Sequence, residues 1–172
     1  MLVTPCAPPT SSATSADRRT ADFACASRTR LTQPDRPVTE AFHAIFAHRP
    51  PWMNAALLTR NRFAAACGLE TSTDDELLHP VVRALYTVGE KIGGWPIHAL
   101  TPHELVAGRD NAHMDFRVSL LKVRDDQGDG LIVTTFCWTK NAFGRLYLAA
   151  VVPFHRPGLD GLIANAARAG RL

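Results

Sequence analysis

The stretch that decides the fold runs from His113 to Leu120 (HMDFRVSL), turns at residues 127–130 (QGDG) and returns from Leu131 to Thr139 (LIVTTFCWT). Both arms are rich in β-branched and aromatic residues, and a Gly-Asp-Gly link between such arms is typical of a β-hairpin. An apolar run over residues 146–152 follows and closes at residues 153–156 (PFHR). The stretch therefore predicts a long hairpin that leads into a C-terminal helix.

Two further strands precede this hairpin in the sequence. Residues 95–100 (WPIHAL) and 104–108 (ELVAG) have strand-like composition, and each is followed by a turn signal. Pro96 predicts an edge position for the first of them, because proline lacks the N–H that a central strand donates. No helix separates these strands, so the pattern favours an antiparallel meander over a parallel, doubly wound sheet.

The beginning of the chain has a different composition. Residues 1–20 are rich in Pro, Ser, Thr and Ala, and such a segment buries too little apolar surface to offset the entropy of ordering. They predict a disordered, dispensable tail, so the single domain is expected to span residues 21–172. A short first strand is expected within residues 21–32.

Two short helices are expected between this strand and the sheet. Asp35 or Thr39 is the candidate N-cap of the first helix, which carries an apolar stripe at helical spacing. The second helix is expected over residues 52–67, with Gly68 as its C-cap. An acidic linker and a helical turn are expected within residues 70–85.

Together these elements predict an α+β fold. A curved antiparallel sheet of about five strands is expected to pack on a long C-terminal helix, with two short helices near the N-terminus. This order is that of a helix-grip layout, in which the sheet wraps the last helix and leaves a cup between them. A cup of this kind offers a concave, mostly apolar site with a few polar groups.

Composition excludes several classes of protein. The net charge is +3 and the arginines are scattered, so nucleic-acid binding is not expected. No apolar run approaches the length of a membrane span, and the N-terminus lacks the apolar core of a secretory signal, so a cytoplasmic protein is expected. The 4 cysteines form no CxxC pair, which argues against a metal site and against a disulfide framework.

Several short motifs resemble those of a known family. They are Pro51-Trp52, Arg60-Asn61-Arg62 with Gly68-Leu69, Val88-Gly89-Glu90, Glu104–Gly108, His113–Arg117, Asn141 with Gly144–Tyr147, and Pro153–Arg156. Together they are similar to a bacterial family known only as a domain of unknown function, over roughly residues 20–170. Met114 stands where that family has leucine, which is a mild exchange.

The resemblance carries expectations about fold and partners. Some members of the family stand alone, and others follow a short-chain-dehydrogenase-like nucleotide-binding domain in the same chain. The family is similar to the helix-grip superfamily of polyketide cyclases and START-like lipid carriers, which implies the same fold but no particular activity. A separate reductase is thus one implied partner. The present chain has no GxGxxG motif after a strand, so no cofactor is expected.

Three polar residues of the hairpin are candidates for chemistry. His113, Asp115 and Arg117 alternate along one predicted strand and would share a face, where they could serve acid–base catalysis or hold a polar ligand. The alternative is that they face solvent, or that Asp115 and Arg117 form a cross-strand ion pair. A metal site of His113, Asp115 and His155 is not expected, because only two of the ligands are local.

The predicted C-terminal helix contributes further candidates. His155 and Arg156 follow Pro153, where they would project into the cup, cap carbonyl groups or meet solvent. Tyr147 lies in an apolar segment, so its hydroxyl is expected to orient a ligand or to make a structural hydrogen bond. Arg145 is oddly placed in a first helical turn, which favours anions, and is therefore expected to have a carboxylate partner.

The function that these observations favour is the binding of a small, largely apolar molecule in the cup. The expected ligand-binding residues are Phe116, Arg117, Phe136, Trp138, Tyr147, His155 and Arg156, with Met53 and Leu57 of the second helix nearby. The first alternative is a small cyclase, dehydratase or isomerase that uses His113, Asp115 or His155 as acid or base. The second is a module that docks on a separate NAD(P)-dependent reductase. The sequence does not decide whether the protein is an enzyme.

Overall fold

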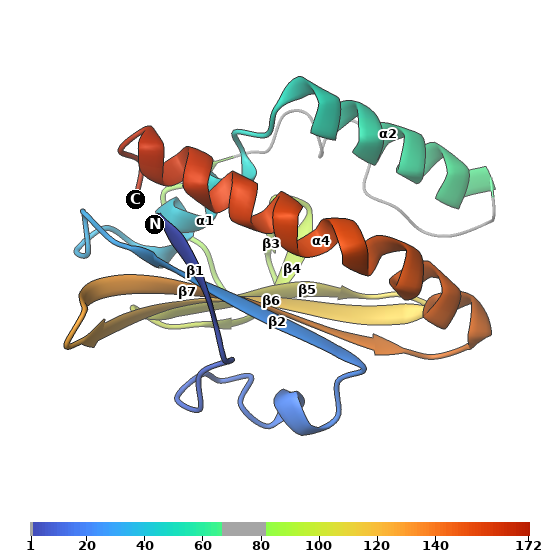
Figure 1. Ribbon diagram of the computed structural model, residues 1–172, viewed down its shortest axis with the longest axis horizontal. Helices are drawn as coiled ribbons and strands as arrows, with labels where there is room; N and C mark the ends of the chain where they lie inside the picture. Colours follow the sequence, from blue (N-terminus) through green and yellow to red (C-terminus); the bar gives the residue numbers. More distant parts are fainter. Residues whose placement is uncertain (1, 67–81) are drawn as a thin grey trace.

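The computed structural model describes residues 2–66 and 82–172 of the chain (Figure 1). Its centre is a seven-stranded antiparallel sheet with the strand order β1-β2-β7-β6-β5-β4-β3. The strands are β1 (Val3–Cys6), β2 (Phe23–Arg30), β3 (Lys91–Ile92), β4 (Trp95–Leu100), β5 (Glu104–Asp110), β6 (Met114–Asp125) and β7 (Gly128–Thr139). The fold class is therefore α+β with an antiparallel sheet, as the sequence predicted.

Three α-helices lie in the described residues: α1 (Val38–Phe46), α2 (Pro51–Ala66) and α4 (Ala142–Arg168). The long helix α4 crosses one face of the sheet, and α2 lies outside it, farther from the sheet (Figure 1). The contact between these two helices includes Met53, whose methyl carbon lies 3.9 Å from the position that a Cβ would take at Gly158. The predicted C-terminal helix is thus confirmed.

The hairpin of β6 and β7 is paired over its full length, from Met114 opposite Thr139 to Asp125 opposite Gly128. Its turn is made by Asp126 and Gln127, just before the expected position. Gly128 follows this turn with φ +87°, a conformation that glycine adopts without a steric penalty. Over Met114–Leu120 of β6, alternate residues are apolar and lie on the face that α1 and α4 cover.

The main core lies between the sheet and helices α1 and α4. Its most buried members include Leu120 and Val133 from the hairpin and Ile163 from α4. Met114 and Val118 are also buried on this face, with the half-buried Phe116 between them. The alternation of β6 therefore turns these three apolar residues toward the helices.

Residues 2–20 differ from the disordered tail that their composition predicted. Val3–Cys6 pair with β2, and the chain then crosses the face of the sheet opposite α4 as loops and a short 3₁₀ helix, η1 (Asp17–Arg19) (Figure 1). On that face the buried carboxylate of Glu104 accepts hydrogen bonds from Ser12 Oγ at 2.5 Å and from the Ala13 N–H at 2.8 Å. These hydrogen bonds offset part of the entropy of ordering the segment.

Two details of the sheet and helices also differ from expectation. The sheet has seven strands rather than about five, because the short strands β1 and β3 extend its two ends. Helix α1 begins after Pro37 without a side-chain cap, so neither Asp35 nor Thr39 caps it. The expected C-cap Gly68 and most of the segment 70–85 lie outside the described residues.

Among residues 2–66 and 82–172, no helix combines the length and the apolar character needed to cross a bilayer.

Candidate functional site

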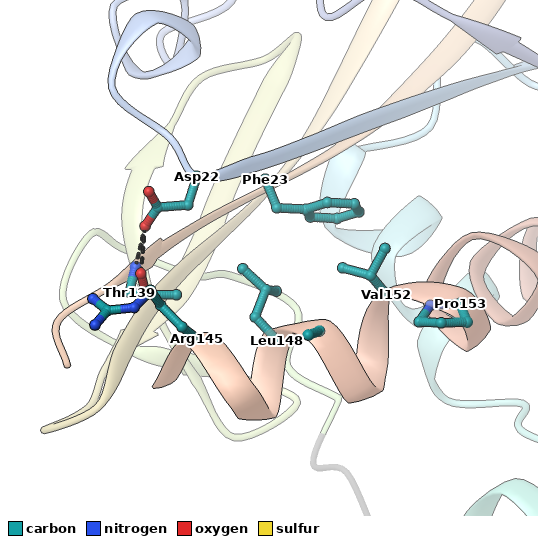
Figure 2. Close-up of a pocket in the computed structure, with 8 residues that line it drawn as sticks. Asp22, Phe23, Thr139, Arg145, Leu148, Val152 and Pro153 are labelled. Atoms are coloured by element: carbon teal, nitrogen blue, oxygen red, sulfur yellow. Dashed lines mark hydrogen bonds between the residues drawn. The ribbon is translucent and has the colours of Figure 1, made fainter. Parts of the chain in front are cut away.

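A groove of about 410 Å³ opens between the N-terminal half of α4 and the adjacent ends of β2 and β7 (Figure 2). Its lining residues are Asp22, Phe23, Thr139, Arg145, Leu148, Ala149, Val152 and Pro153. Most of them are apolar, and the polar ones gather at one end of the groove. A volume of this size lies within the range of sites for small molecules.

The start of α4 is fixed by local chemistry. Asn141 caps the helix, because its Oδ1 accepts a hydrogen bond from the Gly144 N–H at 2.9 Å. Gly144 packs so closely on the main chain of His113 that an added Cβ would lie 2.0 Å from the His113 carbonyl oxygen. The cap and this contact hold the first turn of α4 against the sheet, which places Arg145 and Leu148 along the groove.

The polar end of the groove is built around Asp22. Its Oδ2 accepts hydrogen bonds from the Thr139 N–H at 2.6 Å and from Thr139 Oγ1 at 2.7 Å (Figure 2). These bonds lower the pKa of Asp22, and the positive charge of Arg145 lowers it further. Asp22 is therefore ionised at neutral pH, and the two opposite charges stand at the same end of the groove. The charge of Arg145 acts on Asp22 without an ion pair between the two side chains, so the direct carboxylate partner expected for Arg145 is not confirmed.

The remainder of the groove is apolar. Phe23 faces Leu148 and Val152 across it, and Pro153 lies at the far end (Figure 2). Helix α4 continues through Pro153, which has no N–H to donate to the carbonyl of Ala149 four residues earlier. Both of these residues line the groove, so its wall is a helical segment whose hydrogen-bond ladder is interrupted.

Beyond Phe23, the inner face of α4 continues to His155. The imidazole of His155 packs edge-on against the Phe23 ring, and its Nδ1 lies 3.5 Å from the buried Cys25 Sγ. Burial lowers the pKa of His155 and raises the pKa of the Cys25 thiol. Both groups are therefore neutral at pH 7, which is the opposite of the ion pair in an activated cysteine nucleophile.

The three candidates from the hairpin do not come together. His113 precedes β6, and its buried ring packs edge-on against Tyr147 of α4 with a centroid separation of 5.5 Å. Asp115 points away from α4, and its Oδ1 lies 2.6 Å from Lys140 Nζ. Arg117 shares that face and pairs with Asp110 at 2.6 Å. The predicted ion pair between Asp115 and Arg117 is therefore wrong, because each of the two side chains pairs with another residue.

The expected ligand-binding residues are divided between the two faces of the sheet. Phe136 and Trp138 lie opposite α4, where the Trp138 Nε1 donates to Thr20 Oγ1 at 3.1 Å. Phe116 and Tyr147 lie on the α4 side, and Arg156 is exposed. Phe116 of β6 lies opposite Cys137 of β7 and shares its face. Phe136 and Trp138 flank Cys137 and point to the other face, so they cannot line one cup together with Phe116. None of these residues is among those that line the groove.

Sequence reasoning missed the residues that do line the groove. Leu148, Ala149 and Val152 follow Arg145 at helical spacing, so one face of the predicted helix could have been recognised from the sequence. Asp22 and Thr139 are 117 positions apart, and nothing in the sequence pairs them. The two residues lie next to each other only because β2 pairs with β7.

Comparisons with known proteins place the chain in a family. Among curated proteins, no match was found. The profile of the family DUF2867, described as a protein of unknown function, matches residues 18–159. This range includes all the residues that line the groove. Because the match covers most of the 172 residues, the chain belongs to the DUF2867 family of proteins of unknown function.

Proposed function

We propose that this protein binds a small, largely apolar molecule in the groove between α4 and the ends of β2 and β7. The observation that carries the proposal is the groove itself, which has apolar walls along most of its length and charged groups at one end. Sites for small molecules have this character, since apolar walls supply binding energy and a few polar groups fix orientation.

The layout of the fold supports this proposal. A long helix lies across one face of an antiparallel sheet, as in the helix-grip proteins that the sequence resembles (Figure 1). In such a layout the space between helix and sheet is where a ligand enters. In this chain the groove lies beside the N-terminal half of α4, where Leu148 and Val152 are its inner residues.

Acid–base catalysis is supported less well than binding. Asp22 is the acidic residue that lines the groove, and its lowered pKa makes it a weak base and keeps it from acting as an acid near pH 7. His155, which lies behind Phe23, stays a candidate base, but its Nδ1 contacts a neutral thiol, that of Cys25. Docking on a reductase is suggested only by the resemblance to proteins with fused domains.

The proposal is tested by filling the groove. N-phenyl-1-naphthylamine, a neutral fluorescent probe for apolar sites, is titrated into the full-length protein. Ala149→Phe places a ring in the groove and is expected to weaken probe binding by about tenfold or more, because the ring occupies the probe's volume. Ala150→Phe is the matched control, since Ala150 is also exposed on α4 but does not line the groove.

Two outcomes would contradict the proposal. The first is that the unaltered protein does not bind the probe. The second is that Ala149→Phe binds it as tightly as Ala150→Phe does, with both variants folded by circular dichroism. Native mass spectrometry of protein purified from its own host gives an independent test, because an apolar ligand retained from the cell would appear as an added mass.

A further inference from the structure

We propose that the groove selects neutral ligands whose polar end both donates and accepts hydrogen bonds, such as primary amides and alcohols, over carboxylates and amines. This inference rests on the proposed function and adds to it the chemical class of the ligand. It comes from the pair of charges at the polar end, Asp22 and Arg145, and from the apolar wall that leads away from them.

The two side chains carry charges of opposite sign at the same end of the groove. Asp22 is held in place by two hydrogen bonds from Thr139, and its lowered pKa keeps it ionised. Arg145 belongs to the first turn of α4, and its charge acts on Asp22. In Figure 2 both side chains stand at the end of the groove beside Thr139, so the end carries one negative and one positive charge.

A ligand with a net charge gains little at such an end. A carboxylate attracted by Arg145 would be repelled by Asp22, and an ammonium group attracted by Asp22 would be repelled by Arg145. Either ion would therefore meet one charge of its own sign at the polar end. These penalties act against charged ligands without any steric exclusion.

A neutral donor–acceptor group avoids both penalties. An ionised carboxylate accepts about four hydrogen bonds and a guanidinium donates five, so Asp22 retains acceptor capacity beyond its two bonds to Thr139. An amide or hydroxyl can donate to Asp22 and accept from Arg145 at the same time. Hydrogen bonds to charged groups are stronger than those between neutral groups, so these two bonds would stabilise the complex with the neutral ligand.

The apolar wall limits the size of the ligand. From Arg145 to Pro153 the helix advances by about 12 Å, at a rise of about 1.5 Å for each residue. The wall between them is formed by Leu148, Ala149 and Val152, with Phe23 on the opposite side. An extended eight-carbon chain fits within that length, so octyl compounds are suitable probes.

The test compares octanamide, octanoate and octylamine at pH 7 by displacement of N-phenyl-1-naphthylamine from the full-length protein. Octanamide is expected to bind about tenfold more tightly than either charged compound. Asp22→Asn leaves the charge of Arg145 uncompensated and should make octanoate the tightest of the three. Arg145→Gln leaves Asp22 uncompensated and should favour octylamine. Arg168→Gln, which removes an exposed charge of α4 outside the groove, should keep the original order.

The outcomes separate this inference from the proposed function. If octanoate or octylamine binds the unaltered protein most tightly, the inference is wrong while the groove remains a binding site. If Arg145→Gln leaves the order of affinities unchanged, the inference is likewise wrong. If none of the three compounds displaces the probe and Ala149→Phe does not affect it, both proposals fail. Thermal melts establish that each variant is folded. If Asp22→Asn does not fold, the result for Arg145→Gln alone decides whether the inference is right.

Discussion

Replacing Glu104 tests how the N-terminal segment is held on the sheet. This carboxylate is 6% exposed and accepts hydrogen bonds from Ser12 Oγ, from Ser119 Oγ at 2.6 Å and from the Ala13 N–H. Glu104→Ala removes the common acceptor and leaves those donors without it. A buried donor that loses its partner costs about 1–3 kcal/mol.

The expected size of the effect follows from what the donors can do next. Ser119 is fully buried in β6 and cannot reach water, whereas Ser12 and Ala13 belong to a segment that can detach and become hydrated. The penalties therefore do not add in full, and we expect a loss of about 3 kcal/mol in the free energy of unfolding. With an m-value of about 2 kcal/mol/M, the urea midpoint should fall by about 1.5 M.

The matched control is Glu40→Ala, which removes a carboxylate with an exposed ion pair to Arg36 on the surface of α1. Exposed pairs of this kind contribute less than about 1 kcal/mol. Deletion of residues 2–20 should lower the melting temperature by about 10 °C, since it removes β1 as well as the contacts to Glu104. The reasoning would be refuted if Glu104→Ala and Glu40→Ala shifted the urea midpoint equally, or if the deletion changed the melting temperature by only a degree or two.

Three further predictions concern the core, the response to pH and the start of α4. Phe116→Ala should lower the free energy of unfolding by about 3 kcal/mol in urea melts, because this half-buried ring lies between two parts of the core; an unchanged midpoint would contradict its placement. Burial lowers the pKa of His43 and of His155 below the value of 6.5 expected in the unfolded chain, so the unfolded state binds more protons. Stability should therefore be full above about pH 7 and fall as the pH drops through about 6.5, and urea midpoints that stay constant from pH 7.5 to 5.5 would contradict this. Gly144→Ala should cost about 2–3 kcal/mol because its Cβ would meet a main-chain oxygen, whereas the exposed Gly161→Ala should be neutral or stabilising; equal melting temperatures would refute the close contact.

Local patterns in the sequence were enough to predict most of the elements. The β-branched and aromatic residues around Phe116 predicted β6, and the apolar run over residues 146–152 predicted α4. Strands β4 and β5 were recognisable between turn signals. These features depend on neighbours within a few residues along the chain, and residue preferences act over that range.

The chemistry of the candidate site was not predictable in the same way. His113 was expected to share a face with Asp115, but it lies just before β6, where the alternation of a strand no longer applies, and its ring turns to α4. The groove depends on residues from β2, β7 and α4, and Asp22 and Thr139 meet only because strands far apart in the sequence pair. A single sequence contains no local signal for such a pairing.

The N-terminal segment shows most clearly the difference between what its composition predicts and what its contacts in the folded protein decide. Its Ser, Thr and Pro content is that of a segment hydrated in water, and by itself that composition predicts disorder. The segment is ordered because the folded sheet presents a buried carboxylate, Glu104, that needs hydrogen-bond donors, and because the edge of β2 offers a partner to Val3–Cys6. The sequence by itself predicted most of the strands and helices, but not the short strands β1 and β3. Only the tertiary structure decided which polar groups lose water together, because that depends on contacts between residues distant along the chain.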